Sequence, residues 1–164
     1  MSDSSIVKVG MADLNIASGG LLLRTTGLGS CVGLTLYDTK LKLAGMAHIM
    51  LPSSDIAREG QLNIAKYADT AIPELIARLK ANGAQVDRLV AKMAGGAQMF
   101  AFVSGSDSMR IGPRNVEATK HALQTHSVPL VAEDTGGNYG RTVELDSQTG
   151  LFTIRSVQFG IKEI

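Results

Sequence analysis

The sequence has no tryptophan, a single cysteine and few aromatic residues, which make up 4% of the chain. Positive and negative side chains nearly balance, at a net charge of +1, and lysine and arginine form no block. A nucleic-acid surface built on phosphate contacts and base stacking is therefore not expected. A lone cysteine also excludes an internal disulfide, which favours a reducing compartment.

Long apolar runs are missing as well. No stretch approaches the ~20 residues of a transmembrane helix, and the polar start at residues 1–5 is not typical of a signal peptide. We therefore expect a cytoplasmic protein without direct membrane insertion. Its 164 residues, 45% hydrophobic and 19% charged, suit one domain that spans residues 1–164 and has a core of its own.

Short apolar segments between glycine-rich turns predict more strands than helices. Strands are expected within 5–24, at 32–37, 43–50, 86–94 and 128–132, and in a hairpin of 141–146 with 151–157. Helices are expected at 62–81 and 113–125, and loops at 53–60, 104–108 and 134–140. About eight strands and two helices without regular alternation predict an α+β fold.

The first helix carries a conflict. Apolar residues at helical spacing from Ile64 to Leu79 predict one buried stripe, and Gly83 is a suitable end. Pro73 lies inside this helical segment, where an interior proline costs about 3 kcal/mol. We expect either a kink at Pro73 or a helix that restarts with Pro73 in its first turn.

The only cysteine, Cys31, follows a glycine-rich turn and precedes the strand at 32–37. If the turn to the strand at 43–50 centres on residues 39 and 40, antiparallel partners have numbers that sum to 79. Cys31 then lies opposite His48, with Cβ atoms about 4.5–5.5 Å apart. A slip of one residue would place the two on opposite faces, so the prediction depends on the loop length.

Such a pair suits a nucleophile and its base, with Thr25 or Thr26 as the group that orients the imidazole. Backbone N–H groups from Gly29 through Ser30 to Cys31 can face an oxyanion, and a nearby imidazolium lowers the pKa of a thiol. The alternative for Cys31 is a small buried hydrophobic residue, and for His48 a core histidine whose polar atoms are satisfied.

Other candidate sites are weaker. His121 and His126 do not share a helix face, and no cysteine or histidine pair has metal-ligand spacing. The glycines at 27–29 lack the third glycine and the helix of a dinucleotide fingerprint. The loop at 134–140 favours a structural role over a binding one.

Several segments together resemble the chemotaxis protein CheD family, whose members are chemoreceptor glutamine deamidases. The resemblance rests on residues 25–32, 45–52, 66–70, 94–100, 111–118 and 133–138, in order and at family spacing. It implies a cytoplasmic enzyme that hydrolyses glutamine side chains of methyl-accepting chemotaxis receptors to glutamate through a thioester. It also implies a layered α+β fold like that of bacterial toxin deamidases.

By the same resemblance, Cys31 is the nucleophile, His48 the base and Thr25, rather than Thr26, the orienting residue. The turn residues Gly29 and Ser30 keep the role given to them above from the sequence alone, as the turn that faces the oxyanion. No metal or organic cofactor is implied. The receptors are the substrate, and the phosphatase CheC is a binding partner in many family members. The alternative is a non-catalytic adaptor that binds receptors and CheC.

Overall fold

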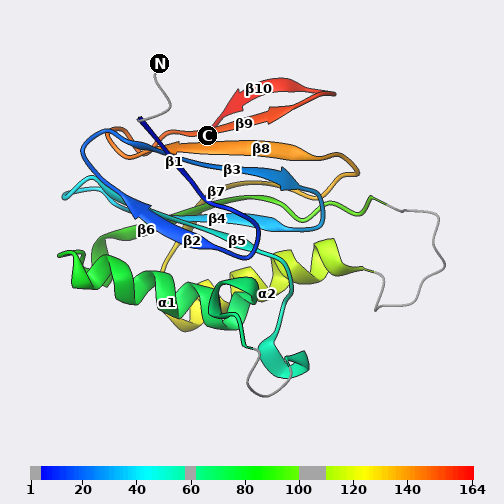
Figure 1. The fold of residues 1–164 in the computed structure, drawn as a ribbon, viewed down its shortest axis with the longest axis horizontal. Coiled ribbons are helices and arrows are strands. Elements are labelled where there is room, and N and C mark those ends of the chain that lie inside the picture. Colours follow the sequence, from blue (N-terminus) through cyan, green and yellow to red (C-terminus); the bar gives the residue numbers. More distant parts are fainter. Residues whose placement is uncertain (1–4, 58–61, 100–109) are drawn as a thin grey trace.

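The computed structural model describes residues 5–57, 62–99 and 110–164. Ten strands in this part of the chain form two five-stranded sheets, which lie face to face (Figure 1). Two α-helices cover the outer face of one sheet, so the layers run sheet, sheet, helices. The predicted α+β fold class, with mixed sheets and two main helices, is confirmed.

The two sheets each combine strands from distant parts of the chain. The first has the spatial order β1 (Ile6–Lys8), β3 (Leu22–Leu28), β8 (Arg141–Asp146), β9 (Phe152–Ser156) and β10 (Gly160–Glu163). The second has the order β2 (Leu14–Ala17), β5 (Leu43–Ile49), β4 (Val32–Asp38), β6 (Leu89–Gly95) and β7 (Leu130–Thr135). The pairs β1–β3 and β6–β7 are parallel, and the others are antiparallel.

The helices are α1 (Ala68–Ala81) and α2 (Ile111–Thr125), with short 3₁₀ turns η2 (Ser54–Ile56), η3 (Ile64–Lys66) and η4 (Val86–Arg88). Helix α1 begins later than predicted because η3 occupies the start of the expected segment. Tyr67, between the two, has an extended backbone and forms a parallel bridge with Leu51. Ile64, which we expected in the buried stripe, is 45% exposed.

Pro73 is the sixth residue of α1, and the helix runs through it without a break. The predicted restart with Pro73 in the first turn is therefore wrong, while the kink stays a prediction. Pro113 does lie in the first turn of α2, where its missing N–H costs no intrahelical bond. Strand β10 was not predicted, and the expected loop at 104–108 lies outside the described residues.

The central strands β4 and β5 are buried at every position, because helices cover one face of their sheet and the other sheet covers the second face. In β4, Leu34 packs toward the helices and Tyr37 toward the other sheet. In β5, Ile49 packs toward the helices and Met46 toward the other sheet. Because side chains alternate along a strand, His48 lies between the two sheets, on the side of Met46.

The β4–β5 hairpin has a register two residues away from the predicted one. Its loop comprises residues 39–42, and His48 lies opposite Gly33 rather than opposite Cys31. The loop is longer because its last residue has a left-handed backbone, with φ of 54°, and because the Asp38 carboxylate accepts two N–H groups of the loop. A shift of two residues leaves every side chain on its predicted face.

Candidate functional site

The imidazole of His48 is held from the first sheet by Thr25. The Thr25 Oγ1 atom lies 2.7 Å from His48 Nδ1 and 2.8 Å from the carbonyl oxygen of Val9. Both side chains are buried, with 1% of each residue exposed, whereas Thr26 is exposed. Thr25 is thus the threonine that contacts the histidine.

The hydrogen bonds at Thr25 determine the tautomer of His48. A threonine hydroxyl has one hydrogen, and here it is donated to the Val9 carbonyl. The contact with His48 therefore requires that Nδ1 carry a hydrogen and donate it to Thr25 Oγ1. In the neutral imidazole the other nitrogen, Nε2, is then left with a free lone pair. This is the protonation state that a general base needs.

Cys31 lies just before β4 and belongs to the hydrophobic cluster between the two sheets, with 9% of its surface exposed. It thus shares the inter-sheet side with His48. The structure does not join them by a hydrogen bond: His48 Nε2 is fully buried and has no partner among the described residues. The two residues lie at neighbouring strand ends, with Cys31 two positions before Gly33, the partner of His48.

Burial shifts both groups toward their neutral forms. It raises the pKa of the Cys31 thiol and lowers the pKa of His48. The lowering of the thiol pKa that we expected from an imidazolium is therefore not seen.

Backbone hydrogen bonds to carbonyl oxygens fix the turn that leads to Cys31. The Gly29 carbonyl accepts the N–H of Ala97 at 2.8 Å, and the Cys31 carbonyl accepts the N–H of Gly96 at 2.9 Å. Gly29 donates its own N–H to Gly27 at 3.1 Å, so this group is engaged within the turn. The end of β6 thus sets the conformation of the cysteine turn.

Two residues near the site were missed in the sequence. Gly33 faces the inter-sheet layer, where a Cβ atom would collide with Leu28 and approach the methyl group of Thr25. Asn115 of α2 is completely buried and donates to the carbonyl oxygens of Ser30 and Met50. A glycine within a strand is a sign of such close approach, whereas the position of Asn115 depends on the tertiary fold.

The loop at 134–140 makes structural contacts, while its lack of a binding role stays a prediction. It surrounds Arg141, whose guanidinium pairs with Asp134 at 3.4 Å, donates to the Gly136 carbonyl at 3.0 Å and stacks on Tyr139 at 4.2 Å. Gly136 also donates its N–H to Gly95 at 3.0 Å. The loop therefore supports the end of β6, which in turn holds the cysteine turn.

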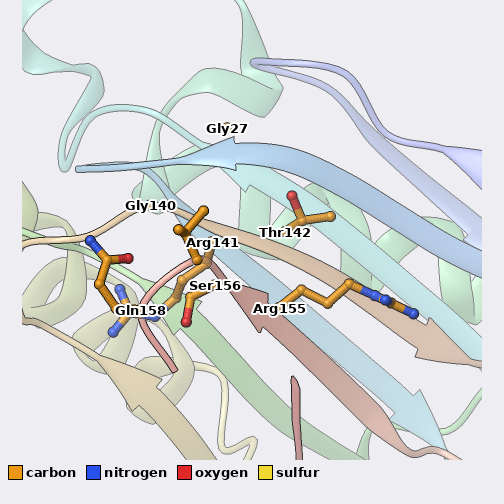
Figure 2. Close-up of a pocket in the computed structure, with 8 residues that line it drawn as sticks. Gly27, Gly140, Arg141, Thr142, Arg155, Ser156 and Gln158 are labelled. Carbon is orange, nitrogen blue, oxygen red and sulfur yellow. The ribbon is translucent and has the colours of Figure 1, made fainter. Parts of the chain in front are cut away.

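A separate groove of about 770 Å³ opens on the outer face of the first sheet (Figure 2). Thr142 of β8 and Arg155 of β9 are paired there and point away from the inter-sheet layer. Gly27 borders this groove, but Thr25, Cys31 and His48 do not. The groove is thus distinct from the candidate catalytic residues.

Within the described ranges, no three histidine, cysteine, aspartate or glutamate residues are placed to hold a metal ion together. The helices found there are also too short or too polar to cross a bilayer.

Comparisons with known proteins point to one family. The CheD family model, described as CheD chemotactic sensory transduction, matches residues 50–156. The chemoreceptor glutamine deamidase CheD of Halalkalibacterium halodurans is 55% identical over 161 residues, covering 98% of this chain and 99% of that protein. The chemoreceptor glutamine deamidase CheD of Bacillus subtilis is 47% identical over 163 residues, covering 99% of this chain and 98% of that protein.

Among solved structures, the Bacillus licheniformis hypothetical protein YfiH aligns with a TM-score of 0.48 and 14% identity. The alignment covers 75% of this chain and 50% of that one.

Proposed function

Because this chain belongs to the CheD family of chemotaxis proteins, we propose that it hydrolyses glutamine side chains of chemoreceptors to glutamate, with Cys31 as nucleophile. One observation carries the proposal: the relay from Val9 through Thr25 to His48 leaves Nε2 as a buried base on the side where Cys31 lies. Most buried polar side-chain atoms have a hydrogen-bond partner, so an unpartnered Nε2 is what a base that awaits a proton would show.

In the first half of the reaction, the Cys31 sulfur attacks the amide carbon of a glutamine as its proton passes to His48 Nε2. The tetrahedral intermediate collapses when His48 returns that proton to the departing nitrogen, which leaves as ammonia. A thioester between Cys31 and the substrate remains. Thr25 keeps the imidazolium oriented by accepting from Nδ1 throughout.

In the second half, Nε2 takes a proton from water as the water oxygen attacks the thioester carbon. The carbon–sulfur bond breaks, His48 returns the proton to the sulfur, and glutamate is released. Atoms balance with water as the only co-reactant, so the mechanism requires no metal or organic cofactor.

In this proposal the oxyanion is stabilised by hydrogen bonds from the N–H groups of Ser30 and Cys31. In a planar trans peptide, a carbonyl and the following N–H point in opposite directions. The Gly29 and Ser30 carbonyls are bound by Ala97 and Asn115, so the N–H groups that follow them face away from those partners. Gly29 contributes the turn rather than a donor, because its N–H is bonded to Gly27.

The test is peptide mass spectrometry of a receptor cytoplasmic fragment incubated with wild type, Cys31→Ala or His48→Asn. We expect conversion of particular glutamines to glutamate by wild type alone, while both variants keep the wild-type circular dichroism spectrum. Conversion by folded Cys31→Ala would overturn the cysteine mechanism.

The second candidate function is a non-catalytic adaptor that binds receptors and the phosphatase CheC. It is favoured by the lack of a hydrogen bond between Cys31 and His48 in the described part of the chain. Binding of the receptor fragment by wild type without conversion would support this adaptor, and CheC binding would be measured next. Either role places the protein in the cytoplasm, in keeping with its single unpaired cysteine.

A further inference from the structure

We propose that Asn115 is a positioning residue for the reaction, because it fixes the peptide group that presents the Cys31 N–H to the oxyanion. The inference rests on the proposed deamidase function and adds to it a residue from α2. Asn115 does not touch the substrate in this scheme. It acts through the backbone of the cysteine turn.

The contacts of Asn115 join three elements. Its Nδ2 atom lies 2.9 Å from the Ser30 carbonyl oxygen and 2.9 Å from the Met50 carbonyl oxygen. Ser30 immediately precedes Cys31, and Met50 is two residues beyond His48. One amide group, completely buried, thus uses both of its hydrogens to hold the nucleophile's turn against the end of the strand that carries the base.

Planarity of the peptide bond transmits this contact to the chemistry. The Ser30 carbonyl and the Cys31 N–H belong to one peptide group and point in opposite directions. Binding of the carbonyl by Asn115 therefore fixes the direction of the N–H. A donor held rigidly toward the developing charge lowers the barrier more than one that must reorient during the reaction.

The start of α2 is itself fixed against the end of β6, which gives Asn115 a firm base. A Cβ atom on Gly112 would collide with the Ala97 carbonyl, and one on Gly96 would collide with Val116. Such close packing leaves α2 little freedom to slide. The same segment, Gly96 and Ala97, binds the carbonyls of Cys31 and Gly29.

The experiment compares wild type with Asn115→Asp, Asn115→Ser and Thr119→Val. Asn115→Asp keeps the shape but replaces both donors by an acceptor that faces two carbonyls. Asn115→Ser is smaller and leaves room for a bridging water if the first variant folds poorly. Thr119→Val is the matched control: Thr119 is buried one turn further along α2, and its hydroxyl has no partner among the described residues.

Three quantities are measured on folded protein: kcat and KM for the receptor fragment, and the rate at which iodoacetamide alkylates Cys31, the only cysteine. We expect kcat to fall by about 10- to 100-fold in Asn115→Asp, as for a misplaced catalytic group. KM and the alkylation rate should stay near wild type, because alkylation uses no oxyanion donor. Asn115→Ser should be intermediate and Thr119→Val unchanged.

A merely structural role for Asn115 gives another pattern. Loosening of the turn would expose the buried thiol, so alkylation would become faster in proportion to the loss of activity, which would overturn the proposal. Wild-type kcat in folded Asn115→Asp or Asn115→Ser would overturn it too. If wild type converts no glutamine, the proposed function fails, and this inference fails with it. If wild type and the Asn115 variants are equally active, only the inference about Asn115 fails.

Discussion

The hydroxyl of Thr25 contacts both the Val9 carbonyl and the imidazole of His48, which comes from the other sheet. It is therefore the first group that we would alter. We expect Thr25→Val to lower kcat, because His48 Nδ1–H and the Val9 carbonyl both lose their partner. An unsatisfied buried donor costs about 1–3 kcal/mol, which corresponds to a loss of roughly 5- to 150-fold if it falls on the transition state. Initial rates on a receptor fragment measure this loss.

Thr25→Ser and Thr35→Val are the matched variants for this prediction. Serine keeps the hydroxyl, so Thr25→Ser should retain most of the activity. Thr35 is also buried, and its hydroxyl donates to the Lys92 carbonyl at 2.9 Å, away from His48. Thr35→Val should lower stability by about 1 kcal/mol and leave kcat unchanged. Equal rates for Thr25→Val and Thr35→Val would show that Thr25 does not orient the base.

The element that positions the cysteine turn is the end of β6, where Gly95 has a φ of +107°. A Cβ atom there would collide with the Cys31 carbonyl. We expect Gly95→Ala to lower the free energy of unfolding by about 1–3 kcal/mol, since it adds both strain and a clash. It should also lower kcat under the proposed mechanism, because the clash displaces the peptide group that follows Cys31. Urea unfolding and initial rates measure the two effects.

Gly140 supplies the control at the same end of the molecule. A Cβ atom on Gly140 would meet no other atom within 4 Å, and its φ is not in the left-handed region. Gly140→Ala should therefore leave both stability and kcat close to wild type. If Gly95→Ala behaves like Gly140→Ala, the end of β6 does not constrain Cys31.

The strands of the hairpin show what the sequence can and cannot predict at this scale. Alternation of side chains placed Cys31 and His48 on the same face, and this survives in the structure because the register error was two residues rather than one. The error itself arose in the loop, where Asp38 binds backbone N–H groups and lengthens the turn. Local side-chain contacts of this kind are not visible in hydrophobic periodicity.

The start of α1 and the contacts of Asn115 were harder to predict from the sequence than the strands of the hairpin. The apolar stripe predicted most of α1, but the start of the helix depends on a bridge between Tyr67 and Leu51, which lie 16 positions apart. Asn115 contacts backbone 65 and 85 positions away, so no spacing in the sequence points to it. Its segment was visible only as part of the family resemblance at residues 111–118.

The far end of the hairpin, remote from Cys31, is joined to the start of β6 by Asp38 and Arg88. The Asp38 side chain is fully buried, and Arg88 binds both of its carboxylate oxygens, at 2.9 to 3.2 Å. Gln85 adds its N–H at 3.2 Å. Burial alone would raise the pKa of Asp38, but the hydrogen bonds from Arg88 and from backbone N–H groups outweigh it and lower the pKa to about 2.

This pair predicts an acid-sensitive fold. An unfolded aspartate has a pKa of about 3.9, so the ionised Asp38 stabilises the fold fully above that value. The contribution is lost as the pH falls from about 4 toward 2, because the unfolded chain takes up the proton first. Asp38→Asn should be less stable than wild type at pH 7, by about 3 kcal/mol for a broken buried pair. The difference should shrink as the pH falls through this range.

Urea midpoints measured at pH 7, 4 and 2.5 on wild type and Asp38→Asn test the sign as well as the size of the effect. Glu144→Gln is the control, because Glu144 pairs with Arg24 in a more exposed bridge, which is worth less than about 1 kcal/mol. A constant gap between wild type and Asp38→Asn would mean that the carboxylate charge contributes nothing. A stability difference that disappears in acid would show that the ionised carboxylate of Asp38 provides the stability. Because Asp38 lies at the end of β4 remote from Cys31, kcat of the folded variant at pH 7 should match wild type.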